Sequence, residues 1–150
     1  MSTLFTIGYE QATSAAVLGE LADAGVGLLV DVRAVAASRR PGFSKRQLAA
    51  GLDERGIRYL HLRGLGTPSE GRLAARKGRL DDLFRIYEAH LATAGAREEL
   101  DVLASLLRSG EHVCILCYER DPAHCHRRRV AEIMRERTKV TVKNLFAPQL

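Results

Sequence analysis

The segment Gly27-Leu28-Leu29-Val30-Asp31-Val32-Arg33 decides the fold prediction. Its apolar side chains follow one another almost without interruption, which is typical of a β-strand that is covered on both faces. Shorter apolar or alternating runs occur at residues 4–8, 57–62, 113–117 and 140–145. Runs of this length and composition, placed between turn-forming residues, predict five strands in all.

Helical patterns separate most of these strands. Apolar residues recur at helical spacing after Ser14 and after Ser44, and again in the segments 81–92, 96–108 and 122–137. The order β-α-β-α-β-α-α-β-α-β predicts an α/β fold, with an open, mostly parallel five-stranded sheet and helices on both faces. We expect residues 1–150 to form one Rossmann-like, three-layer domain.

The composition is that of a water-soluble globular chain. Of its 150 residues, 46% are hydrophobic and 27% are charged, which predicts a folded rather than a disordered chain. No apolar stretch approaches the roughly 20 residues of a membrane span, and the N-terminus carries no export-signal pattern. Three cysteines fit a reducing compartment better than a disulfide framework. These features predict a cytoplasmic protein without a membrane partner.

The charge balance is moderately basic. The 23 lysines and arginines exceed the 18 acidic residues by five, and arginine supplies most of the cations. Arginine suits planar anions because its donors form a fixed fork, although a GC-rich genome also produces this bias. The exposed stretch Arg72 to Arg79 contains four cations. We expect it to be a solvated loop rather than a phosphate-binding surface.

Open parallel sheets bind ligands outside the carboxyl ends of their strands. Residues that follow the strands should therefore share one edge of the sheet. Asp31 and Arg33 end one strand, and we favour a functional role for this pair over a structural bridge because buried charges need partners or a ligand. The candidate site residues at the edge are Gly8, Tyr9, Asp31, Arg33, Arg39, Cys117, Glu119, Cys125, His126 and Arg127.

The segment 117–127 carries most of the chemistry. Asp121 suits the N-cap and Pro122 the first position of the helix predicted over residues 122–137, which places Cys125 in or just past the first turn. Unpaired N–H groups at that end favour a thiolate or a bound phosphate. Cys125 is a candidate nucleophile and His126 a candidate general acid or base. A buried structural role for both residues is equally open.

A metal site is a weaker alternative, and the main interpretation includes no cofactor and no metal. Cys114 and Cys117 form a Cys-x-x-Cys motif, but alternation along a strand sends them to opposite faces of the sheet. A site built from Cys117, Cys125 and His126 with His61 is geometrically possible. A phosphatase-type or rhodanese-type loop is disfavoured, because neither cysteine has an arginine six positions later.

Several short motifs occur in order along almost the whole chain. They are Thr6-Ile7-Gly8-Tyr9, Leu29-Val30-Asp31-Val32-Arg33 with Ser38-Arg39, Phe43-Ser44, Gly56-Ile57-Arg58-Tyr59 through Leu65-Gly66, Cys117-Tyr118-Glu119 and Cys125-His126-Arg127. Together they resemble the domain-of-unknown-function family 488 (DUF488) of bacteria and archaea. The resemblance implies an α/β fold but no activity. The positions it marks for attention are Asp31, Arg33, Cys117, Glu119, Cys125, His126 and Arg127.

Two function classes follow from these residues. The first is an enzyme or binding protein for a small anionic ligand, phosphorylated or nucleotide-like. Its arginines at 33, 39 and 127, with Gly8, Tyr9 and Cys117, would bind the ligand, and Asp31 or Glu119 would add acid–base work. The alternative is a nucleic-acid-binding module without catalysis, which would place Arg39-Arg40, 72–79 and 127–129 on phosphates.

Overall fold

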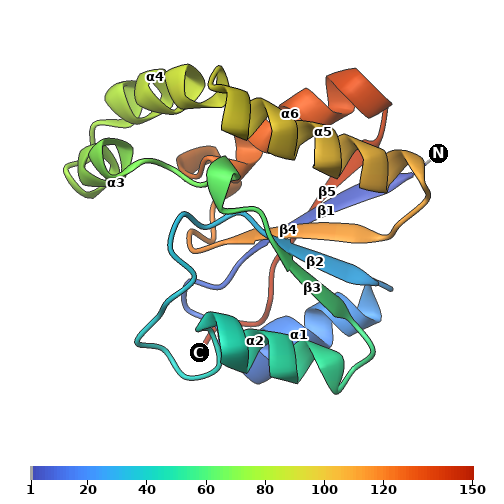
Figure 1. The fold of residues 1–150 in the computed structure, drawn as a ribbon. Helices are drawn as coiled ribbons and strands as arrows, with labels where there is room; N and C mark the ends of the chain where they lie inside the picture. The colour runs from blue at the N-terminus through green and yellow to red at the C-terminus, as the bar shows by residue number, and fades with distance from the viewer. Residues whose placement is uncertain (1) are drawn as a thin grey trace.

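The computed structural model describes residues 2–150, and its centre is a five-stranded sheet in which every strand pair is parallel (Figure 1). The strand order across the sheet is β3-β2-β4-β1-β5. The strands are β1 (Thr3–Gly8), β2 (Leu28–Asp31), β3 (Arg58–His61), β4 (Val113–Cys117) and β5 (Thr141–Leu145). The structure confirms the predicted α/β fold with a parallel sheet.

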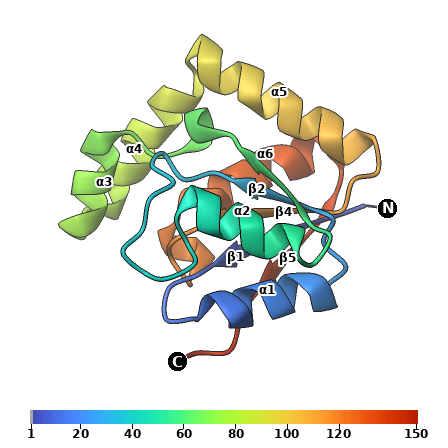
Figure 2. The same ribbon diagram turned by 60° about the horizontal axis from the view of Figure 1, so that its bottom comes forward.

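Helices cover both faces of the sheet. The first face carries α1 (Ser14–Asp23) and α2 (Lys45–Asp53), which lie below the sheet in Figure 1. The second face carries α4 (Leu80–Leu91), α5 (Ala94–Arg108) and α6 (Arg127–Thr138). Helix α3 (Ser69–Arg76) packs beside α4 at the end of this layer, as Figure 2 shows from a second direction. No helix in residues 2–150 has the length and apolar character that a bilayer crossing requires.

The central strand β4 explains why two separate cores form. All five of its residues are buried, and their side chains alternate between the faces. Ile115 and Cys117 pack into the core beneath α5 and α6, whereas Cys114 and Leu116 pack into the core above α1 and α2. The prediction that Cys114 and Cys117 lie on opposite faces of the sheet is therefore confirmed.

The strand order creates a crevice between β1 and β4. These strands are neighbours in the sheet, but α1 follows β1 on one face and α6 follows β4 on the other. The chain therefore departs from adjacent strands in opposite directions. Such a topological switch point is where open α/β sheets bind their ligands.

Two predicted elements need correction. The predicted helix over residues 122–137 is divided: Pro122–His124 form a separate 3-10 turn, and α6 begins only at Arg127. Asp121 caps the short turn, since its Oδ1 accepts a hydrogen bond from the backbone N–H of Ala123 at 2.9 Å. The stretch 72–79, expected as a solvated loop, is largely the end of α3 and the turn into α4.

Candidate functional site

A cleft of about 690 Å³ opens at the switch point between β1 and β4. Its floor consists of residues that follow β1, β2 and β4, and its opposite wall comes from α3 and the start of α4. Six of the residues predicted from sequence line it. These are Tyr9, Arg33, Cys117, Glu119, Cys125 and His126. The rule that strand ends share an edge thus brings together side chains that are more than one hundred residues apart in the chain.

Four other candidates lie outside the cleft lining. Asp31 and Arg127 are completely buried behind the floor, and Arg39 is exposed to solvent elsewhere. Gly8 does not line the cleft but permits its construction. A Cβ atom at this position would lie 1.7 Å from the carbonyl oxygen of Glu119, so the end of β1 and the loop after β4 approach closely only because Gly8 has no side chain.

Asp31 and Arg33 form a closed, buried ion pair. The Arg33 Nη2 atom donates to Asp31 Oδ2 at 2.7 Å, and Nε donates to Oδ1 at 2.9 Å. The hydroxyl of Tyr59 donates to the same carboxylate at 2.6 Å. The remaining Arg33 donor group, Nη1, reaches the Phe43 carbonyl oxygen at 2.8 Å and the Tyr9 hydroxyl at 3.3 Å. Each of the three guanidinium nitrogens therefore has a protein acceptor.

The guanidinium of Arg127 is similarly occupied. Its Nε donates to Thr6 Oγ1 at 3.2 Å, and Nη2 donates to the Arg120 carbonyl oxygen at 3.1 Å. Its Nη1 donates to the Glu119 carbonyl oxygen and to Cys117 Sγ, the latter at 3.0 Å. Burial lowers the pKa of Arg127 to about 10, which still leaves it charged at neutral pH. Arg127 thus ties the loop after β4 to the start of α6.

The two cysteines of the floor converge. The sulfur atoms of Cys117 and Cys125 are in direct contact, at the separation of a bonded pair. A carboxylate oxygen of Glu119 lies within 4.8 Å of both sulfurs, so the three residues form a group with metal-ligand chemistry. His61, considered as a ligand from the sequence, is outside this group; its Nε2 donates instead to the Arg33 carbonyl oxygen at 2.7 Å.

His126 has a defined orientation at the N-terminus of α6. Its Nε2 lies 2.7 Å from the carbonyl oxygen of Val32, which can only accept, so Nε2 carries the proton. The unprotonated Nδ1 therefore faces Cys125 Sγ at 3.7 Å. Burial lowers the pKa of His126 to about 4, and the ring is neutral at pH 7. Val32, in the loop after β2, thus determines which ring nitrogen of His126 faces the Cys125 sulfur.

Glu119 is one of two acidic groups that line the cleft, the other being Glu10. Burial raises the pKa of its carboxyl above the ordinary value, and the nearby charge of Glu10 acts in the same direction. Its Oε2 lies 3.9 Å from Cys117 Sγ. Glu119 is thus placed to exchange a proton with this thiol, or to act as a ligand beside it.

The wall opposite the floor supplies two arginines that the sequence interpretation assigned to a loop. Arg72 and Arg76 are four residues apart on α3, so they share one helix face, and both line the cleft. Within residues 2–150, neither guanidinium has a hydrogen-bond or ion-pair partner. The helical i, i+4 spacing was the available sequence signal, but the segment has few apolar residues to mark it as a helix.

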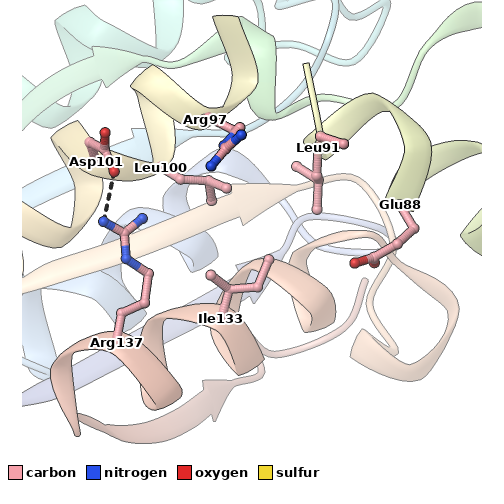
Figure 3. A pocket seen from close by; sticks show the side chains of 8 residues that line it. Glu88, Leu91, Arg97, Leu100, Asp101, Ile133 and Arg137 are labelled. Atoms are coloured by element: carbon pink, nitrogen blue, oxygen red, sulfur yellow. Dashed lines mark hydrogen bonds and ion pairs between the residues drawn. The ribbon is translucent and has the colours of Figure 1, made fainter. Parts of the chain in front are cut away.

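A second hollow of about 510 Å³ lies away from the strand ends, between α4, α5 and α6. Figure 3 shows its lining, including the ion pair that joins Arg137 to Asp101 at 2.6 Å. Glu88, at its other side, pairs with Arg129 at 2.9 Å. The charges of Arg137, Asp101 and Glu88 are thus paired within the protein, and the hollow brings together none of the predicted site residues.

The fold and the cleft define a class: an all-parallel, three-layer α/β protein with a thiol-bearing site at its topological switch point. The chain belongs to the family described as Domain of unknown function DUF488, whose profile matches residues 13–134. The predicted family membership is thus confirmed. Comparisons with curated proteins and with solved structures returned no match.

Proposed function

We propose that this protein binds a small anionic ligand in the cleft between β1 and β4, with Arg72 and Arg76 as the groups that hold the anion. The observation that carries the proposal is the difference between the arginines around the cleft. Protein acceptors occupy Arg33 and Arg127, whereas Arg72 and Arg76 face the cleft without a partner in residues 2–150. Two free forks on one helix face match a phosphate or carboxylate group.

The size of the cleft supports a small ligand. A volume of about 690 Å³ falls within the roughly 300–1,000 Å³ of pockets that hold small molecules and cofactors. Tyr118 lines the cleft, is 44% exposed and packs edge-on against the buried Tyr9 with ring centroids 5.3 Å apart, which gives one wall an aromatic surface. A phosphorylated or nucleotide-like molecule would use both features, the arginines for its anion and the aromatic wall for its apolar part.

The surface of α6 is less suited to the alternative, a nucleic-acid-binding module. Arg127 is completely buried, Arg128 stacks over Phe84 with its guanidinium carbon 4.6 Å from the ring centroid, and Arg129 pairs with Glu88. A phosphate backbone would have to displace these contacts. The catalytic roles suggested for Cys125, His126, Asp31 and Glu119 stay predictions, as does a cytoplasmic location.

Isothermal titration calorimetry with inorganic phosphate, pyrophosphate and adenosine monophosphate tests the proposal. Each charge-assisted hydrogen bond contributes at least about 1.5 kcal/mol, so the double variant R72A/R76A should bind the best of these probes about 100-fold more weakly. R79A is the matched control, because Arg79 belongs to the same basic stretch but does not line the cleft. Equal losses in R79A and R72A/R76A, or no binding of any probe, would contradict the proposal.

A further inference from the structure

We infer that Cys117, Glu119 and Cys125 bind one zinc-class divalent metal ion on the floor of the cleft, and that His126, which contacts Cys125 but lies outside this close group, completes the site as a fourth ligand. The first three ligand atoms lie within 4.8 Å of one another. The four residues come from the end of β4, the loop after it and the residues just before α6. None of these ligands belongs to α3, which carries the proposed anion-binding arginines of the same cleft.

The backbone spacing favours a shared ion over a disulfide. The Cα atoms of Cys117 and Cys125 are 7.6 Å apart, whereas disulfides usually span about 4.4–6.8 Å. A disulfide at this position requires the two backbone segments to approach each other. Zinc binds each thiolate at about 2.3 Å in tetrahedral geometry and would hold the two sulfurs about 3.8 Å apart, so the contacting sulfurs would separate on binding while the wide backbone spacing is kept.

The environment of His126 matches that of a metal-bound histidine. Ligating histidines usually donate their second ring N–H to a carboxylate or a backbone carbonyl oxygen, which fixes the ring. His126 Nε2 makes such a bond to the Val32 carbonyl oxygen at 2.7 Å. Its Nδ1 is left toward the cysteine pair, 3.7 Å from Cys125 Sγ, a distance typical of two ligands on one tetrahedral ion.

The charges of the site balance when an ion is present. Two thiolates and one carboxylate carry a charge of −3, and a divalent ion together with the Arg127 guanidinium carries +3. Arg127 is completely buried, and no carboxylate forms an ion pair with it among residues 2–150. Its Nη1 lies 3.0 Å from Cys117 Sγ, and its backbone N–H lies 3.5 Å from Cys125 Sγ. Both sulfurs thus have an N–H donor that supports a metal-bound thiolate.

The ligand types select the class of metal. Thiolate and imidazole ligands favour zinc over magnesium and calcium, which prefer oxygen ligands. Cys114 takes no part, because its side chain lies on the opposite face of β4 and is completely buried. It therefore provides a cysteine-to-serine control within the same strand.

The test is metal content and cobalt binding of the full chain. Protein purified without chelator should contain one zinc ion per chain by inductively coupled plasma mass spectrometry. Co²⁺ added to protein stripped of metal should produce thiolate-to-cobalt charge-transfer absorption. C117S and C125S should bind Co²⁺ at least tenfold more weakly, and C114S should bind it like the wild type. E119Q keeps the size of the side chain and should weaken binding at least tenfold without loss of the folded circular-dichroism spectrum.

Three results would overturn the inference. The first is that stripped wild-type protein binds neither Zn²⁺ nor Co²⁺ after thiol reduction. The second is that C117S and C125S bind metal as tightly as the wild type. The third is that C114S loses as much metal affinity as C117S and C125S. Phosphate binding by calorimetry is measured separately on the stripped protein, so failure of the metal site and failure of the anion site are distinguishable.

Discussion

Replacement of Asp31 by alanine tests whether the buried pair at the end of β2 holds the site together. Asp31 is completely buried, and its carboxylate accepts hydrogen bonds from the Arg33 backbone N–H at 3.1 Å, from the Arg33 side chain and from the Tyr59 hydroxyl. The variant D31A leaves the buried Arg33 guanidinium without a counter-charge. Removal of one partner from a buried ion pair typically costs about 3–5 kcal/mol.

This cost is a large part of the roughly 5–15 kcal/mol that stabilises a domain, so D31A should unfold at a much lower urea concentration. Y59F removes only one hydrogen bond to the same carboxylate and should lose about 1.5–3 kcal/mol of unfolding free energy. D101A breaks the solvent-exposed pair with Arg137 and should lose less than about 1 kcal/mol.

Urea denaturation followed by circular dichroism gives the three unfolding free energies under one set of conditions. The reasoning requires the order D31A, then Y59F, then D101A, from largest to smallest loss. If D31A is destabilised by less than about 1 kcal/mol, the pair is not a structural element of the fold. That result would favour a functional role for Asp31 and Arg33, as the sequence predicts, over a structural ion pair.

Two further variants test other contacts. G8A places a Cβ atom 1.7 Å from the Glu119 carbonyl oxygen and should cost about 1–3 kcal/mol or more in urea denaturation, because backbone must move; an unchanged midpoint would show that the two loops separate freely. E88Q removes a surface pair with Arg129. The hydrogen bond from Arg129 lowers the pKa of the Glu88 carboxyl below its ordinary value, so the pair stabilises the fold above the ordinary carboxyl pKa. E88Q should therefore lose less than about 1 kcal/mol of unfolding free energy at pH 7, and this difference from the wild type should disappear as the pH falls through the lowered pKa of Glu88. A difference in unfolding free energy that persists at pH 2 would contradict this assignment.

The strands were predictable from sequence because the sheet is buried on both faces. Val113–Cys117 is apolar at all five positions, and burial of this kind leaves a clear signal in the residues themselves. Helix α3 was not predicted, since only Gly71 and Ala74 of its residues are buried and its other positions are mostly polar. Local pattern identifies a helix poorly when the helix has little apolar surface to bury.

The start of the predicted helix over residues 122–137 was wrong for a different reason. Asp121 and Pro122 are good start signals, and they do begin a turn. The chain then leaves helical geometry at Cys125, and His126 bonds to the Val32 carbonyl oxygen, which is 94 residues away in the sequence. No local pattern contains that contact, and it is the contact that aims Nδ1 at the cysteine pair.

The location of the candidate site was predictable from the sequence, but which of its arginines are free to bind a ligand was not. The rule that strand ends share an edge placed Tyr9, Arg33 and Cys117 together, and all three line the cleft. Sequence could not show that Arg33 is satisfied by Asp31 and Phe43, whereas Arg72 has no partner among residues 2–150. Residue type gives charge, but only the fold shows which charges are already neutralised.

The most direct test of anion binding in the cleft is a crystal structure with the tightest-binding of the three calorimetric probes. Anion oxygens are expected within about 2.7–3.2 Å of the guanidinium nitrogens of both Arg72 and Arg76, above the floor formed by Cys117 and Cys125. An anion bound at Arg39 or on the outer surface of α6, with the cleft occupied only by water, would contradict the proposal.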